Sequence, residues 1–205
     1  AALDFIGGTP AIVKLHQGTQ GIGTMIADTP QAVTSLLETL WAMGQDIILQ
    51  EYIAESKGRD YRVIVVGGRV IAAMRRQAKK GEFRSNLHRG GLGVRVELPK
   101  EYRQAAIAAA KVMGLEVAGV DMLQGRDGPK ILEINSSPGL EGIERTSGVD
   151  VAGAIISHAE KFLARRKKRR ARRDPVVEAE QRNTRMRPIE VARAGSMLKR
   201  ARAGG

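Results

Sequence analysis

Two carboxylates and an amide stand in neighbouring apolar runs. Asp121 lies within VAGVDML (117–123), and Glu133 and Asn135 lie within KILEIN (130–135). Residues two apart on a strand face the same side, and counting outward from the turn places Asp121 nearly opposite Glu133. Such an oxygen set suits Mg²⁺, which also takes ligands from phosphates. The alternative is an exposed polar face of a half-buried sheet, although facing like charges destabilise a hairpin unless they are compensated.

A glycine-rich segment, QGTQGIG (17–23), separates two short β-prone runs, and Lys14 lies on the first of them. Backbone amides in such a turn can cradle phosphate oxygens, and a flanking lysine can neutralise their charge. In a Walker loop the lysine follows the glycines into a helix, whereas here it precedes them. The pattern predicts either a phosphate-binding loop or a plain hairpin turn.

The segment RSNLHRGG (84–91) combines an arginine, a hydroxyl, an amide and paired glycines. A guanidinium can bind a pair of oxygens, and glycines let a loop close, so the composition suits an anion-binding lid. A solvated charged loop explains it equally well. His88 alone does not indicate catalysis.

The elements that must position these residues alternate between hairpins and helices. We expect strands at 11–16, 24–27 and 47–53, one hairpin at 61–66 and 69–75 around Gly67-Gly68, and a second at 117–123 and 130–135 around a turn at 125–129. We expect helices from Pro30 to Met43, from Pro99 to Met113, and from about 149 to 164. The apolar face of the second should be Ala106, Ala109, Ala110 and Met113. This order favours an α+β fold with antiparallel sheets over a doubly wound parallel sheet.

Composition excludes several classes of site. The 205 residues include no cysteine and three histidines, so thiolate and histidine-rich metal sites are excluded or disfavoured, and any metal should be oxygen-bound. No run approaches the roughly 20 consecutive apolar residues of a membrane span, and no signal pattern opens the chain. We therefore expect a cytoplasmic protein without a membrane partner.

The net charge of +12 belongs almost entirely to the end of the chain. Residues 164–205 hold 15 Lys and Arg against 4 Asp and Glu, and the rest of the chain is nearly neutral. This pattern predicts a body at 1–164 and a basic, largely disordered tail at 165–205. The tail could bind RNA or ribosomes through phosphate contacts, which is the non-enzymatic alternative for the chain, or it could be a solvated charged segment.

Five stretches together resemble a known family over about residues 5–163. KLHQGTQGIG, LQEYI, FRSNLHRGG, VAGVDML and EINSSPGLEGIE are similar to the RimK-type α-L-glutamate ligases, ribosomal protein modification enzymes of the ATP-grasp superfamily. The resemblance implies an ATP-grasp fold of two α+β subdomains that grip ATP. It also implies an ATP-dependent ligase that joins a carboxylate to an amine and releases ADP and phosphate.

The resemblance also implies roles for individual residues. Lys14 and Arg84 would stabilise charge during catalysis, and Asp121, Glu133 and Asn135 would hold Mg²⁺ or Mn²⁺, with two ions expected. The nucleotide would contact Lys14, Gly18, Thr19, Gln20, Gly21, Gly23, Gln50, Glu51, Tyr52, Ile53, Asp60, Arg84, Ser85 and Asn86.

The implied substrates are ATP, glutamate and the C-terminal carboxylate of an acceptor, expected to be a small-subunit ribosomal protein. Amino-acid carrier proteins and coenzymes ending in glutamate are alternative acceptors, and a homo-oligomer is a further expected partner. The reaction would pass through an acyl phosphate, with the loop at 136–142 beside the reacting carboxyl group or serving simply as a connection. The family has a further N-terminal domain and an upstream phosphate-contacting lysine, so we expect Ala1 to mark a truncation.

Overall fold

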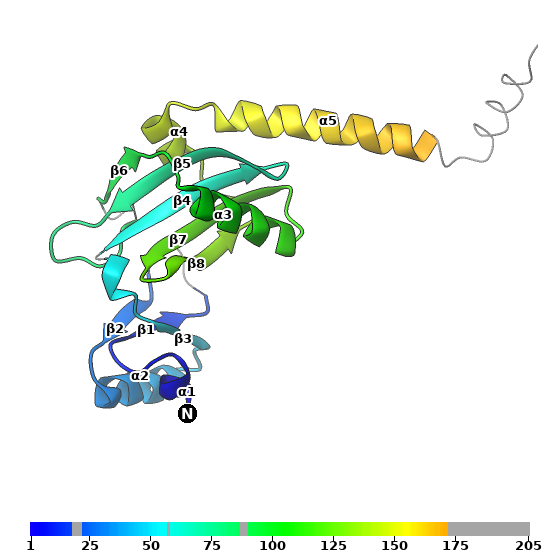
Figure 1. The fold of residues 1–205 in the computed structure, drawn as a ribbon. Coiled ribbons are helices and arrows are strands. Elements are labelled where there is room, and N and C mark those ends of the chain that lie inside the picture. Colours follow the sequence, from blue (N-terminus) through cyan, green and yellow to red (C-terminus); the bar gives the residue numbers. More distant parts are fainter. Residues whose placement is uncertain (18–21, 57, 87–89, 172–205) are drawn as a thin grey trace, which may run out of the picture. The chain divides into compact units, whose positions relative to one another are not determined.

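A computed structural model describes residues 1–17, 22–56, 58–86 and 90–171. The chain divides into two compact units, 1–155 and 156–205. The first unit holds two antiparallel sheets with packed helices (Figure 1), which confirms the α+β prediction. Within the described ranges, no helix is both long enough and apolar enough to cross a bilayer.

The smaller sheet has three strands in the order β2-β1-β3. Its strands are β1 (Ala11–Leu15), β2 (Thr24–Ala27) and β3 (Ile47–Glu51), and both pairings are antiparallel. Helices α1 (Ala2–Phe5) and α2 (Pro30–Ala42) lie against this sheet around buried Ala11, Ala27 and Val33 (Figure 1). Thr29 caps α2, because its Oγ1 accepts a hydrogen bond from Ala32 N at 3.2 Å ahead of the first-turn proline.

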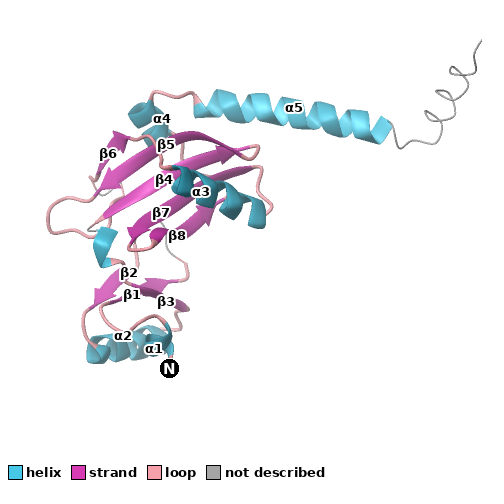
Figure 2. Ribbon diagram, in the orientation of Figure 1, coloured by secondary structure: helices cyan, strands magenta, loops and turns pink. Residues whose placement is uncertain are grey.

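The larger sheet has five strands in the order β6-β5-β4-β7-β8 (Figure 2). They are β4 (Arg59–Val66), β5 (Arg69–Gln77), β6 (Leu92–Arg95), β7 (Val117–Gly125) and β8 (Gly128–Asn135). Gly67 and Gly68 both have positive φ, which a two-residue turn of this kind requires, and they form the first predicted hairpin.

Helices cover the two faces of this sheet differently. On one face α3 (Lys100–Val112) packs through Tyr102, Ala106 and Ala110. On the other, α4 (Glu141–Ser147) and the start of α5 (Val151–Ala171) pack over Ile64, Met74 and Ile143. A short 3₁₀ turn, Ala54–Ser56, follows β3. The α4 and α5 helices cover only part of their face, and the polar residues of β4, β5 and β7 lie on the remainder of it.

Several expected boundaries were wrong. The second hairpin turns through two residues between Gly125 and Gly128, rather than through 125–129. Met113 is 57% exposed, so the apolar face of α3 ends earlier than predicted. Strand β6 and helix α4 were not predicted. The last helix continues through the basic run to Ala171 instead of ending near 164, and residues 172–205 lie outside the described ranges.

Candidate functional site

The first unit contains a cavity of about 760 Å³ that is lined by residues from both sheets. Most of the residues predicted to bind nucleotide or metal line it: Lys14, Gln50, Glu51, Tyr52, Ile53, Asp60, Arg84, Ser85, Asn86, Asp121, Glu133 and Asn135. Residues far apart in the sequence therefore lie around one cavity. We call this cavity the cleft.

The glycine loop is only partly described. Gly18, Thr19, Gln20 and Gly21 lie outside the described residues, as do residues 87–89 of the second loop. Gly23 is described and does not line the cleft; its φ is +76°, and a side chain there would collide with Leu15. The phosphate-binding role of the loop stays a prediction.

Asp121 is the most constrained charged residue of the cleft. Its side chain is 2% exposed, and two guanidinium groups bind it. Arg62 donates from Nε to Oδ1 at 2.8 Å and from Nη2 to Oδ2 at 2.6 Å, and Arg76 donates from Nη2 to Oδ2 at 2.8 Å. A buried carboxylate needs such partners, because an unpaired charge out of water is strongly unfavourable.

A second carboxylate completes this group. Arg76 Nε donates to Asp60 Oδ1 at 2.6 Å, and Arg76 Nη2 donates to Asp60 Oδ2. Asp60 also forms a side-chain hydrogen bond with Ser85, which links the strand to the second predicted loop. Two arginines and two aspartates thus form a formally neutral cluster, Arg62–Asp121–Arg76–Asp60, which we call the buried ion cluster.

One β-bulge sets the register that assembles the buried ion cluster, and a second places Glu133 beside it. Between β4 and β5 the register shifts at Ile64/Val65, and Asp60 pairs with Arg76. Between β7 and β8 it shifts at Asp121/Met122, and Asp121 pairs with Glu133, as predicted. A bulge adds one residue to one strand, so it decides which of two neighbouring side chains faces the cleft.

The charges of the cluster move the pKa of Asp121 in a definite direction. Burial alone would raise this pKa, but the hydrogen bonds from Arg62 and the positive charge of Arg76 outweigh burial and hold it below its ordinary value. The carboxylate is therefore ionised at neutral pH and remains so under mildly acidic conditions.

Glu133 and Asn135 present oxygens beside this cluster. Glu133 is 50% exposed and lies 3.9 Å from Arg62 Nη2, and Asn135 Nδ2 donates to Glu133 Oε1 at 3.1 Å. In the described ranges no three His, Cys, Asp or Glu side chains are grouped to hold a metal, so the amide of Asn135 would have to supply the third ligand. Two carboxylates and an amide carbonyl form an all-oxygen set that fits Mg²⁺ or Mn²⁺.

Lys14 faces the same space from the smaller sheet. Partial burial lowers the pKa of Lys14 below its ordinary value, and the negative charges of Glu133 and Asp121 partly offset this effect. The ammonium group is therefore incompletely compensated, and an anion in the cleft would improve its environment.

Glu82, just before the second predicted loop, fixes the side chain of Arg84 at the start of that loop. Glu82 accepts hydrogen bonds from Arg84 Nε at 2.9 Å and Nη2 at 2.7 Å, and from the backbone N–H of Arg84 and Phe83. The side-chain hydrogen bond from Arg84 is the largest reason that the pKa of Glu82 falls to about 2. Ser85 is 6% exposed, and the segment 83–86 lines the cleft.

Arg62 and Arg76 are cleft residues that the sequence motifs did not reveal. Arg62 is two residues from Asp60 on one strand, so alternation alone places both on one face. That signal was available. Arg76 was harder to find, because an unbulged hairpin around Gly67-Gly68 would place Arg75 opposite Asp60.

Comparison with known proteins assigns the family. A model of the RimK-like ATP-grasp domain matches residues 1–159. The chain belongs to the RimK-like ATP-grasp family.

Two relatives of this family are similar over most of the chain. It is 56% identical over 162 residues to a probable alpha-L-glutamate ligase of Picosynechococcus sp., covering 79% of this chain and 54% of the relative. It is 57% identical over 156 residues to one of Azotobacter vinelandii, covering 76% and 52%. The RimK-like chain thus spans about half the length of the curated relatives it matches.

Solved structures agree with the ATP-grasp fold. The ATP-grasp ligase PsnB, complexed with a phosphomimetic variant of minimal precursor, Mg and ADP, matches with a TM-score of 0.58 and 27% identity, covering 76% of this chain and 46% of PsnB. The D-alanine–D-alanine ligase of Bacillus anthracis complexed with ATP matches with a TM-score of 0.59 and 23% identity, covering 82% and 56%. The second likeness shows the fold alone.

Asp121 and Glu133 of the cleft should differ sharply in their effect on stability. Asp121→Asn should lower the free energy of unfolding by about 3 kcal/mol or more, because Arg62 and Arg76 keep their charge but lose a buried partner. Glu133→Gln should cost less than about 1 kcal/mol, because Glu133 is half-exposed and its ion pair is long. Urea denaturation of both variants measures the difference.

If Asp121→Asn does not fold, the double variant Asp121→Asn/Arg62→Met should recover part of the stability. Equal losses for Asp121→Asn and Glu133→Gln would contradict the buried ion cluster.

Proposed function

We propose that the cleft binds Mg·ATP and that residues 1–164 are the ATP-grasp part of an ATP-dependent ligase that forms carbon–nitrogen bonds. The observation that carries this proposal is the meeting of Lys14 with the oxygen set Asp121, Glu133 and Asn135 in one cavity. Membership of the RimK-like family supports it, as does the Mg and ADP complex of the structural neighbour PsnB.

Each part of the nucleotide has candidate contacts around the cleft. Lys14, Arg84 and the glycine loop (Gly18, Thr19, Gln20, Gly21 and Gly23) would bind the phosphates, and Gln50 to Ile53 would hold the adenine end. Asp60 orients Arg76, and Ser85 and Asn86 line the same space. Asp121, Glu133 and Asn135 would hold two Mg²⁺ or Mn²⁺ ions, which screen negative charge when bound.

The reaction that we infer has two steps. An acceptor carboxylate attacks the γ-phosphorus of ATP. The bond between this phosphorus and the oxygen that bridges it to the β-phosphate breaks, so that ADP departs and an acyl phosphate is formed. The amino group of glutamate then attacks the acyl carbon, loses a proton and expels phosphate to form an amide. In the first step both reactants are anions, so Lys14 and Arg84 contribute by position and charge rather than by covalent catalysis.

The names of the relatives guide the choice of substrates. Probable alpha-L-glutamate ligases at 54–57% identity favour glutamate as the amine, and the precursor bound by PsnB favours a peptide or protein acceptor. We propose the C-terminus of a small-subunit ribosomal protein as the acceptor, with amino-acid carrier proteins and coenzymes ending in glutamate as alternatives. A cytoplasmic location and a homo-oligomeric assembly complete the proposal.

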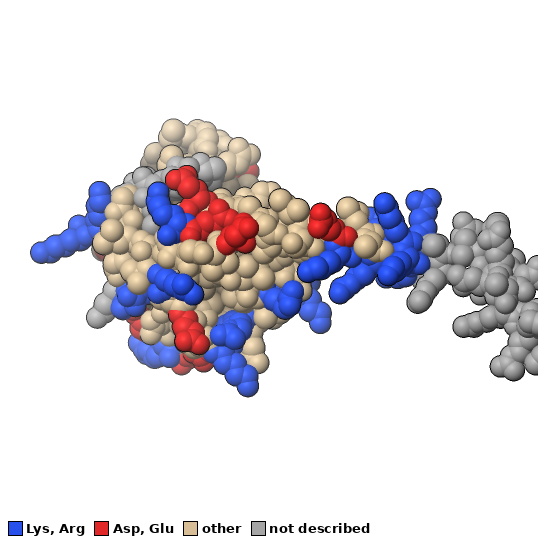
Figure 3. All heavy atoms as spheres, turned by 90° about the horizontal axis from the view of Figure 1, so that it is seen from above, with Lys and Arg blue, Asp and Glu red and all other residues tan. Residues whose placement is uncertain are grey.

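The basic end of α5 supports a second function, RNA contact. Residues 165–170 are six consecutive Lys and Arg on a described helix, and all are exposed. Figure 3 shows these cations gathered along the described end of α5. Such a helix can bind phosphates without reading sequence, and together with the rest of 165–205 it would dock the ligase on an RNA-rich substrate.

The ligase proposal predicts glutamate transfer that depends on ATP and Mg²⁺. Because this chain spans about half of its relatives, the test uses the chain itself and a chimera that adds the part of the Picosynechococcus relative which this chain does not cover. Mass spectrometry of the acceptor should show glutamate-sized additions, with ADP and phosphate released. Glu133→Gln in the chimera should reduce turnover by at least about tenfold, because the metal loses a charged ligand. AMP instead of ADP, or transfer without a divalent ion, would overturn the proposal.

Removal of residues 165–205 should abolish salt-sensitive RNA binding while leaving Mg·ATP binding unchanged. Removal of 172–205 alone keeps the six cations of α5 and serves as the matched control. With only those six cations left, a plot of log K against log salt concentration should keep a slope of at most roughly 4 in magnitude on single-stranded RNA. Filter binding across a salt series measures it, and equal RNA affinity for the full chain and the 165–205 deletion would refute the docking function.

A further inference from the structure

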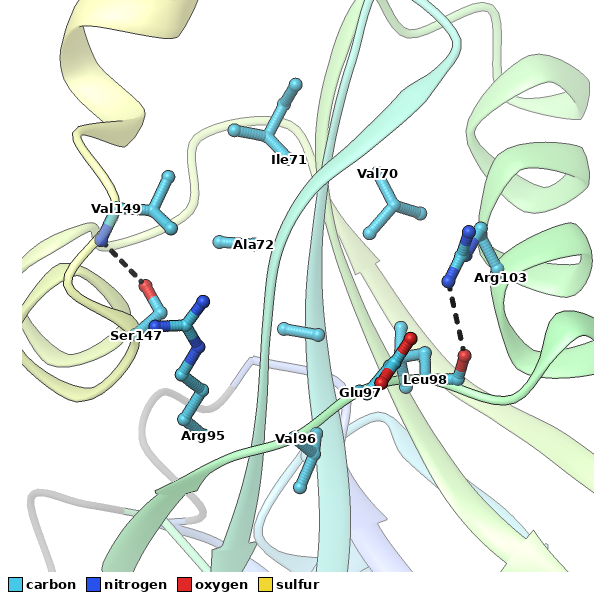
Figure 4. A pocket seen from close by; sticks show the side chains of 11 residues that line it. Val70, Ile71, Ala72, Arg95, Val96, Glu97, Leu98, Arg103, Ser147 and Val149 are labelled. Carbon is cyan, nitrogen blue, oxygen red and sulfur yellow. Dashed lines mark hydrogen bonds between the residues drawn. The ribbon is translucent and has the colours of Figure 1, made fainter.

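A second cavity, of about 270 Å³, lies at an open edge of the larger sheet (Figure 4). Strand β6 pairs with β5 from Met74 to Gln77, whereas residues 69–73 of β5 pair with β4 and, in the described ranges, with no strand on their other side. After Arg95 the chain leaves β5 and crosses to α3. We call this cavity the edge notch; its lining includes Val70, Ala73, Arg95, Glu97, Arg103 and Ser147.

An open strand edge is a site for pairing. Along residues 69–73, the N–H and C=O groups that point away from β4 can bond to an added extended segment. Recognition by strand addition takes its affinity from such main-chain bonds and its specificity from the side chains around the edge.

The side chains around the edge notch are charged on both sides of the strand. Figure 4 shows Arg95 extending toward Ser147 on one side of β5, with Arg103 and Glu97 on the other. Arg103 Nη2 lies 3.4 Å from the Leu98 carbonyl oxygen, which holds its guanidinium at the rim. The lining carries two arginines and one glutamate, so the notch favours a negatively charged segment.

This arrangement selects among the possible occupants. A strand added to β5 would send neighbouring side chains to opposite faces, and each face offers one arginine. Neighbouring carboxylates would therefore each meet a cation. A second copy of this chain at the same edge would bring like-charged arginines together. The basic segment after residue 164 is also a poor occupant, because its cations would be repelled by Arg95 and Arg103.

We propose that the edge notch binds an extended peptide with adjacent acidic side chains, which adds a strand to β5 beyond the end of β6. The notch is distinct from the cleft but close to it. Ala72 in the notch and Arg76 in the cleft are four residues apart on one face of β5, about 13 Å. Helix α4 borders both, through Ser147 and Arg145 respectively.

Fluorescence anisotropy with a short labelled peptide, in which pairs of adjacent glutamates alternate with valine and threonine, tests the proposal on the 205-residue chain. The peptide should bind, and Arg95→Glu and Arg103→Glu should each weaken binding by about tenfold. Lys111→Glu, an exposed cation at the far end of α3, is the matched control and should bind like the wild type. A peptide with lysine in place of glutamate should not bind.

Two further measurements separate strand addition from charge attraction. N-methylation of alternate peptide nitrogens should abolish binding, because it removes main-chain donors. Hydrogen exchange should slow at residues 69–73 when the peptide binds. Undiminished binding of the methylated peptide, protection confined to cleft residues, or a dimer of the chain protected at this edge would each overturn the proposal. None of these results depends on ATP, so failure here leaves the ligase proposal untouched.

Discussion

The ionised carboxylate of Asp121, buried in the middle of a sheet, is the constraint on which the rest of the site depends. A charge removed from water must be paired with good geometry, and here pairing requires Arg62 from β4 and Arg76 from β5. Arg76 is itself buried, so it needs Asp60 as a further partner. Three neighbouring strands are thereby fixed against one another at the end of the sheet that faces the cleft.

The neutral cluster lies at the wall of the cleft, and Asp121 belongs both to the cluster and to the oxygen set beside it. The buried ions satisfy one another, while half-exposed Glu133, Asn135 and the strained charge of Lys14 face the cavity. A lysine whose folded pKa is lowered destabilises the folded state while it is charged; that cost is fully present below the lowered pKa and disappears as the pH rises from there through the ordinary pKa. Bound phosphate would remove the same cost at neutral pH. Phosphate binding at the cleft would therefore use the unfavourable charge of Lys14, which the fold tolerates without a ligand.

Local sequence patterns revealed the two hairpins and the start of α2 at Pro30, because glycine turns and a first-turn proline have local causes. Counting from the turn placed Asp121 only nearly opposite Glu133, because an unbulged hairpin would pair it with Leu132 and the bulge at Asp121/Met122 brings Glu133 into register. Arg76 could not be anticipated, since choosing it over Arg75 depends on a bulge at Ile64/Val65 that arises from packing across the whole sheet. Strand β6 and helix α4 are short, and tertiary contacts decide whether such segments form. Roles in nucleotide and metal binding could not be decided from local patterns, and the resemblance to RimK-type ligases supplied these expected roles for the cleft residues.

Calorimetric and thermal-unfolding titration of the 205-residue chain with Mg·ATP tests most directly whether the cleft is a metal–nucleotide site. The wild type should gain about 2.7 kcal/mol of stability at a hundredfold excess over Kd. Without ligand, Glu133→Gln and Lys14→Met should be about as stable as the wild type. With Mg·ATP, both variants should lose most of the stability that the wild type gains. The same gain in all three proteins, or none in the wild type, would contradict the assignment of the cleft.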